Sequence, residues 1–203
     1  MADAREAPRL IVFSDTARAS PAEIVTRFAR LAERARPSSI LFYLRDYDLP
    51  LRTRWQLGVR LAALAEGAQQ RFGVADRADW ALALGGSALH LPQSGLSARD
   101  ARRFVGPSLF LSRGSHDPSA VAEPELDALL LSPIFEPRKG RPALGLLALE
   151  RAPKVPALYA LGAVEAHNAA LCLMAGAAGV AVIGAALAAD PVPLLGALGI
   201  LRD

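Results

Sequence analysis

Short, nearly continuous apolar runs alternate with longer amphipathic stretches along this 203-residue sequence. The runs do not alternate between apolar and polar residues, so they fit strands that are buried on both faces of a sheet. Eight such runs occur, and each predicts a strand. The predicted strands cover residues 9–14, 39–44, 71–75, 87–91, 108–112, 127–132, 155–162 and 179–184.

The stretches between the runs predict helices. The clearest start is Ser20-Pro21-Ala22-Glu23, because it combines an N-cap serine, a proline at the first helical position and an acid in the first turn. The predicted helices cover residues 21–34, 53–69, 76–84, 98–104, 144–150 and 165–175, with a short turn at 118–122.

Strands that are separated by helices pair in parallel through right-handed crossovers. Eight such units in about 200 residues match a small (β/α)8 TIM barrel, which we expect to form a single domain over residues 1–203. The alternative is a doubly wound open sheet, which more often carries a glycine-rich phosphate fingerprint after its first strand. Here the first strand is followed by "DTARAS", which has no glycine.

Composition excludes several classes of partner. The net charge is only +3 and the arginines are scattered, whereas a nucleic-acid site needs a basic stripe or patch. The single cysteine, Cys172, rules out a disulfide framework and suits a reducing compartment. The polar N-terminal segment lacks the apolar core of a signal peptide, so a cytoplasmic location is expected.

Residues 169–189 carry no charge and are long enough to cross a bilayer. The glycine-rich break "MAGAAG" divides this segment, so it predicts a helix, a turn and a buried strand, and no membrane partner is expected. Whether the chain forms a homo-oligomer stays open.

In a TIM barrel the functional residues lie at the C-terminal ends of the strands. That rule selects candidates without any family knowledge: Arg45, Asp76, Gln93, His116, Lys139, Gly162 and Gly184. Two of them have a structural alternative. Arg45 could be a solvated surface charge, and Asp76 could be a helix N-cap. His90 lies within a strand and is expected to be a packed histidine.

Six motifs of this sequence resemble the thiamine phosphate synthase and thiazole tautomerase family. They occur in the family's order, from the second strand to the eighth. The motifs are "FYLRDYD" (42–48), "VADRADWALALGGSALHLPQ" (74–93), "SRGSHDP" (112–118), "SPIFEPRKGRPALG" (132–145), "LGAV" (161–164) and "AGAAGVAVIGA" (175–185).

The resemblance implies roles for the last three motifs. Lys139 would contact the pyrophosphate of a pyrimidine substrate, and Gly162, Ala163, Gly184 and Ala185 would bind the phosphate of a thiazole. Ala163 stands where the family has a second glycine, a replacement that is tolerable if φ stays negative. Gly184 stands where the family has a serine, so one hydroxyl donor is absent.

Other positions depart from the family pattern. Tyr43 replaces a glutamine, Tyr47 a lysine, Ala75 an asparagine, Gly95 the second Mg²⁺ aspartate and Gly114 a serine. These changes predict weak binding of Mg²⁺-pyrophosphate and low condensation activity.

Three interpretations therefore remain, and the first is a thiazole tautomerase, which needs no cofactor. In it His116 would carry a proton, while Arg113, Arg45 or Lys139 would hold a substrate carboxylate. The alternative is a synthase that condenses a pyrimidine diphosphate with a thiazole phosphate, using Arg45, Lys139 and Mg²⁺ held by Asp76. The third is a paralogue that binds a phosphorylated ligand without catalysis.

Overall fold

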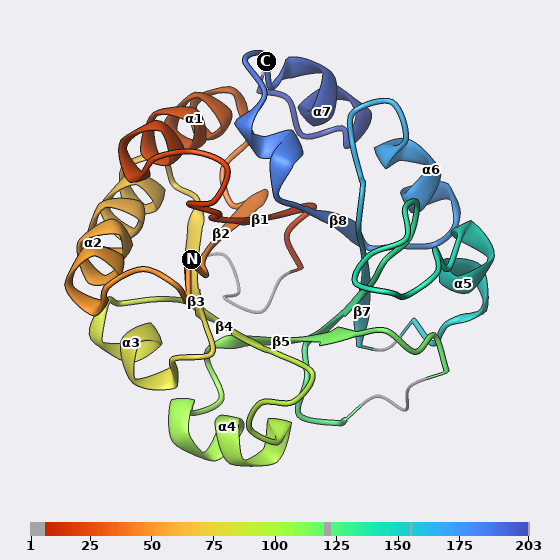
Figure 1. The fold of residues 1–203 in the computed structure, drawn as a ribbon, viewed down its shortest axis with the longest axis horizontal. Helices are drawn as coiled ribbons and strands as arrows, with labels where there is room; N and C mark the ends of the chain where they lie inside the picture. Colours follow the sequence, from red (N-terminus) through yellow and green to blue (C-terminus); the bar gives the residue numbers. More distant parts are fainter. Residues whose placement is uncertain (1–6, 120–122, 155, 203) are drawn as a thin grey trace.

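The computed structural model describes residues 7–119, 123–154 and 156–202. Eight parallel strands close into a barrel in which each strand pairs with its neighbours in sequence and β8 pairs with β1 (Figure 1). The predicted TIM barrel is confirmed. The strands are β1 (Leu10–Phe13), β2 (Ile40–Leu44), β3 (Arg71–Ala75), β4 (Ala88–Leu91), β5 (Phe110–Ser115), β6 (Ala128–Leu131), β7 (Ala157–Leu161) and β8 (Gly179–Val182).

Helices form a ring outside the strands (Figure 1). They are α1 (Pro21–Arg34), α2 (Leu51–Gly67), α3 (Ala78–Ala83), α4 (Ala98–Val105), α5 (Leu146–Arg151), α6 (Ala169–Met174), the 3₁₀ helix η1 (Gly184–Leu187) and α7 (Val192–Ala197). The last two were not predicted. Of the turn predicted at 118–122, only Pro118 and Ser119 lie within the described residues, and both are in a turn.

Helix α1 has the predicted bounds because its start is fixed by a capping box. The Ser20 side chain accepts from the Glu23 amide, and the Glu23 carboxylate accepts from the Ser20 amide at 2.9 Å. Helix α6 begins later than predicted, because the Asn168 side chain accepts from the Glu165 amide at 2.8 Å and holds residues 165–168 in a turn.

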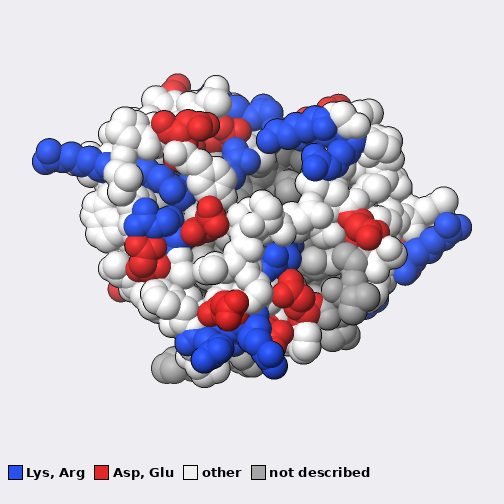
Figure 2. All heavy atoms as spheres, turned by 60° about the horizontal axis from the view of Figure 1, so that its bottom comes forward, with Lys and Arg blue, Asp and Glu red and all other residues white. Residues whose placement is uncertain are grey.

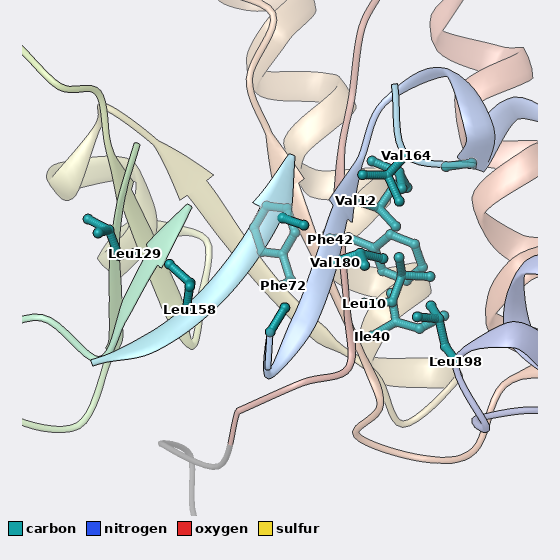
Figure 3. Packing of buried hydrophobic residues seen from close by; sticks show 14 of the residues in the cluster. Leu10, Val12, Ile40, Phe42, Phe72, Leu129, Leu158, Val164, Val180 and Leu198 are labelled. Atoms are coloured by element: carbon teal, nitrogen blue, oxygen red, sulfur yellow. The ribbon is translucent and has the colours of Figure 1, made fainter. Parts of the chain in front are cut away.

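Two apolar layers stabilise the barrel. The outer layer packs the strands against the helices and includes Leu10, Phe42 and Val180 from the strands and Leu198 after α7 (Figure 3). The inner layer fills the barrel with alternate residues of the strands, including Tyr43 and Tyr159. In strands buried on both faces, neighbouring side chains point alternately inward and outward, so the apolar runs encode both layers.

Among the described residues, no helix is both long and apolar enough to cross a membrane. The uncharged segment 169–189 divides into α6, a turn and β8, as its glycine-rich break predicts, followed by η1, which was not predicted. Figure 2 shows basic and acidic side chains interspersed on the face that it presents, without a continuous basic stripe.

Candidate functional site

The strand ends bring the predicted site residues to one rim. Arg45, Asp76 and His116 directly follow β2, β3 and β5, while Lys139 and Gly162 lie in the loops after β6 and β7. Because all eight strands are parallel, these positions lie at the same end of the barrel. The predicted arrangement on a single rim is confirmed, and two adjoining pockets there contain most of these residues.

The first pocket, which we call the phosphate pocket, has a volume of about 210 Å³ and lies over the ends of β7 and β8. It contains all four predicted phosphate-binding positions, Gly162, Ala163, Gly184 and Ala185. Gly184 and Ala185 begin η1, and amides at the start of a helical turn have no acceptor within that turn. The pocket can therefore offer backbone donors to an anion.

Glycine is required at position 162. Its φ is +108°, which side chains strongly disfavour, and a β-carbon there would lie 2.9 Å from the Cα of Pro133. The Gly162 carbonyl also accepts from the Phe135 amide at 3.2 Å. The loop after β7 thus interlocks with the loop after β6.

The condition of a negative φ at Ala163 is not met, because its φ is +51°. The Ala163 carbonyl accepts from the Asn168 side-chain amide at 3.0 Å, and the same side chain accepts from the Glu165 amide. These bonds stabilise a left-handed conformation that the family's glycine would adopt without strain.

The second pocket, which we call the cationic pocket, has a volume of about 170 Å³ and shares Arg138, Leu161, Gly162 and Ile183 with the first. Four basic side chains line it, and no carboxylate residue does so in the part of the chain that the structure describes. The basic residues are Arg45, Arg138, Lys139 and Arg141. Arg45 is also paired with Asp15, at 3.1 Å between Nη2 and Oδ2, so its structural alternative and its site role are both compatible with the geometry.

Lys139 lies at the tip of a tight hairpin. Arg138 and Arg141 exchange two backbone hydrogen bonds of 3.0 Å, and the residues between them, Lys139 and Gly140, have φ values of +50° and +75°. Two central residues at positive φ define a type I′ turn. The hairpin therefore carries three basic side chains, those of Arg138, Lys139 and Arg141.

His116 is half-buried and lines the cationic pocket. Its Nδ1 lies 2.6 Å from the Ser132 carbonyl oxygen and 3.2 Å from the Ser132 hydroxyl. Because a carbonyl can only accept, Nδ1 carries the proton, and Nε2 is the nitrogen left for a ligand.

Three predicted residues, Gln93, Arg113 and Asp76, are not among those that line these pockets. Strand β5 runs to Ser115, so Arg113 lies inside it and points outward, next to the inward-facing Ser112. Its guanidinium is held by the carbonyls of Gln93 and Leu96 and pairs with Glu123 at 3.0 Å. Arg113 therefore does not reach a substrate that is bound in either pocket.

Asp76 is exposed on the far side of the rim, and its φ is +65°. Its structural alternative as an N-cap is wrong, because Arg77 caps α3 and no side-chain cap bond is made there. Its side chain lies near the guanidinium groups of Arg54 and Arg77.

The residues present do not fit a magnesium site. Among the described residues, no group of three or more histidine, cysteine, aspartate or glutamate side chains is arranged so that it could hold a metal ion. At Gly95, where the resemblance expects the second acid, a β-carbon would lie 2.9 Å from Cδ of Pro92. A lone carboxylate beside two arginines is a poor anchor for Mg²⁺.

Aromatic side chains fill the barrel below the ends of β1, β2 and β4. The rings of Phe13 and Tyr43 stack at 5.2 Å, and His90 meets Phe13 edge-on at 5.0 Å. The Ser112 hydroxyl bonds to Tyr43 at 2.9 Å and to His90 at 3.0 Å. Burial, followed by the charges of Arg113 and Arg45, lowers the pKa of His90 to about 3, so it is a neutral packed histidine, as predicted.

Sequence reasoning missed Arg18, Arg138 and Arg141, which line the pockets. The signal for the last two was present in "PRKGRP", where basic residues flank a Lys-Gly turn. Arg18 had no comparable signal, because it is a single arginine in a segment without glycine after the first strand.

Comparison with known proteins decides the family. Residues 16–186 match the family described as thiamine monophosphate synthase. The chain belongs to this family. A thiamine-phosphate synthase of Mycobacterium sp. (strain KMS) is 38% identical over 154 residues, covering 70% of this chain and 67% of that protein. Another from Mycobacterium bovis (strain BCG / Pasteur 1173P2) is 30% identical over 198 residues, covering 92% and 84%.

Among solved structures, the thiamine phosphate pyrophosphorylase from Pyrococcus furiosus superimposes with a TM-score of 0.78 at 25% identity. The match covers 96% of this chain and 97% of that one. The names of these thiamine monophosphate synthase relatives favour the synthase interpretation over the tautomerase interpretation, which the sequence motifs put first.

Proposed function

We propose that this protein condenses a pyrimidine diphosphate with a thiazole phosphate, forming thiamine phosphate and releasing pyrophosphate. The observation that carries the proposal is the pair of adjoining pockets that share Gly162 and Arg138. A tautomerase substrate would bring only a carboxylate to the cationic pocket, whereas the four basic side chains there suit the larger charge of a diphosphate.

The thiazole phosphate would bind in the phosphate pocket, where backbone amides around Gly162 and Gly184 can donate to the anion. The diphosphate would lie in the cationic pocket between Arg45 and the β6 hairpin. Because the two pockets share a wall, the thiazole ring and the pyrimidine carbon would meet between them.

In the reaction, the bond between the pyrimidine-bearing carbon and the pyrophosphate oxygen breaks, and its electron pair leaves with pyrophosphate. The lone pair of the thiazole nitrogen forms the new carbon–nitrogen bond. Negative charge therefore grows on the leaving group. Cations held in place beforehand, here Arg45, Arg138, Lys139 and Arg141, stabilise such charge most effectively.

The charge lost at Tyr47 is in part offset from other elements. The β6 hairpin adds Arg138 and Arg141 to the cationic pocket. Since the residues do not fit a metal site, we assign no step to a metal ion that the protein holds.

Tautomerase activity is the second candidate, and His116 is the observation that favours it. Its Nδ1 proton is held by Ser132, which leaves Nε2 to exchange a proton with a ligand in the cationic pocket. Arg45 or Lys139 could then hold the substrate carboxylate.

The test is an assay of the purified protein with both condensation substrates, measuring thiamine phosphate and pyrophosphate in equal amounts. One arm contains Mg²⁺ and another contains EDTA. We expect product that depends on Lys139. No product in either arm would overturn the proposal. Interconversion of thiazole phosphate carboxylate tautomers that depends on His116 would then support the second candidate, and binding without turnover the non-catalytic one.

A further inference from the structure

Arg18 reaches the phosphate pocket from the other end of the sequence. It follows β1, and its amide donates to the Asp15 carbonyl at 3.0 Å. Because β1 closes the barrel beside β8, this loop lies next to Gly184 and Ala185, and Arg18 lines the pocket with them. The side chain is 49% exposed, so a ligand can reach it.

The guanidinium of Arg18 is anchored on one side. Its Nε lies 3.3 Å from Oδ2 of Asp15, the same oxygen that pairs with Arg45. Its Nη1 lies 3.3 Å from the place where a β-carbon of residue 184 would stand. Nη1 therefore borders the pocket wall next to the place where a side chain at position 184 would begin.

We propose that Arg18 is a ligand of the substrate phosphate, and that residue 184 is glycine because the guanidinium needs this space. The proposal rests on the phosphate pocket of the proposed function. In the family resemblance a serine at position 184 supplies a hydroxyl; here a guanidinium supplies charge and two parallel N–H donors, which suit a phosphate. The site would thus select the phosphorylated thiazole over the free thiazole alcohol.

Arg18 balances the charge of the side chains that line the phosphate pocket. Arg18 and Arg138 are its cations, and Glu136 and Glu165 are its acids. Without Arg18, one cation would face two carboxylates, so the side chains would oppose a phosphate that the backbone amides attract. Glu136→Gln should shift this balance the other way and strengthen phosphate binding.

The test is calorimetric titration of the full chain with inorganic phosphate, thiazole phosphate and the free thiazole alcohol at one ionic strength. We expect Arg18→Ala to weaken both phosphate ligands by about 10- to 100-fold and to leave the alcohol unchanged, because hydrogen bonds to charged groups are lost. Arg18→Lys should be intermediate. Arg30→Ala, an exposed position on α1 outside the pocket, is the matched control.

A second variant separates space from charge. Gly184→Ser should push the guanidinium aside and weaken thiazole phosphate binding in the native background, while in the Arg18→Ala background it should restore part of the affinity through its hydroxyl. Opposite signs in the two backgrounds support the proposal. Equal effects in both, or unchanged phosphate affinity in Arg18→Ala, overturn it.

These outcomes are distinct from those of the condensation assay. Arg18-dependent phosphate binding without product would remove the proposed reaction and leave the role of Arg18 standing. Product formation with an unchanged KM for thiazole phosphate in Arg18→Ala would do the reverse. A native protein that binds neither phosphate ligand would overturn both.

Discussion

At the ends of β7 and β8 the groups that face a ligand are mainly backbone atoms, whereas at the ends of β2, β3 and β4 they are side chains. The β7–β8 side keeps Gly162 and Gly184 around an open pocket. The β2–β4 side has Tyr47, Gly95 and an isolated Asp76 over a barrel filled by Tyr43 and His90.

The difference shows how two kinds of site respond to sequence change. A site of backbone amides tolerates substitution as long as the turn geometry survives, as Ala163 at positive φ illustrates. A site of side chains loses its charge with each replacement, but another loop can resupply it. Here the hairpin after β6 brings Arg138, Lys139 and Arg141 to the same rim.

Gly162→Ala should break the backbone-built side most strongly. The new β-carbon would lie 2.9 Å from Pro133, and the alanine would have to adopt a φ that it disfavours. The free energy of unfolding should therefore fall by about 3–4 kcal/mol. A loop displaced by about 1 Å should also lower thiazole phosphate affinity by about 100-fold. Denaturant unfolding and titration measure both.

Gly196→Ala is the control for that variant, because nothing lies within 4 Å of its β-carbon position and it lies inside α7. It should be neutral or slightly stabilising. Equal stability of the two alanine variants would contradict the interlocked loops.

His90→Gln tests whether the β2–β4 side is structural. The pKa of His90 is about 3 in the folded protein against 6.5 ordinarily, so between these values only the unfolded chain binds the proton. Stability is therefore lost as the pH falls from about 6.5 toward 3, by about 3 kcal/mol at pH 4. The variant should lose correspondingly less between pH 7 and pH 4, as measured by urea unfolding. An identical pH dependence would show that His90 is solvated.

Lys139→Ala should weaken the stabilisation of pyrophosphate in the cationic pocket. Removing one preorganised cation from a developing negative charge typically costs about 100-fold in kcat, and we expect that fall in condensation. Stability should not change, because Lys139 is exposed. Arg60→Ala, exposed on α2, is the control, and a kcat for Lys139→Ala equal to that of the control would remove Lys139 from the reaction.

Ala163→Gly should produce the smallest effect. Glycine adopts the left-handed conformation without strain, and its greater freedom in the unfolded chain offsets part of this benefit. The free energy of unfolding should therefore rise by about 0.5–1 kcal/mol. Ala197→Gly in α7 should instead cost about 1 kcal/mol. Thermal unfolding compares the two, and a loss at both positions would show that Ala163 is not strained.

The sequence predicts the barrel well because strand and helix periods are local properties. The capping box at Ser20 and the apolar runs set most element bounds without tertiary information. The topology alone also brings Arg45, His116 and Lys139, three candidates chosen at strand ends, to the lining of one pocket.

The failures have a different origin. The prediction for Arg113 assumed that the strand ends at residue 112. Because β5 continues to Ser115, Arg113 lies within the strand, on its outer face, between the inward-facing Ser112 and Gly114. The φ of Ala163 depends on the Asn168 side chain, and the place of Arg18 depends on the closure of β1 against β8. These are contacts between segments that local patterns do not encode.

A crystal structure of the protein with thiazole phosphate and pyrophosphate bound together tests the two-pocket account most directly. The account predicts the thiazole phosphate against Gly162 and Gly184, with Arg18 in contact, and the pyrophosphate between Arg45 and Lys139. Pyrophosphate bound at Asp76 through a metal ion, or either anion bound only outside these pockets, would contradict it.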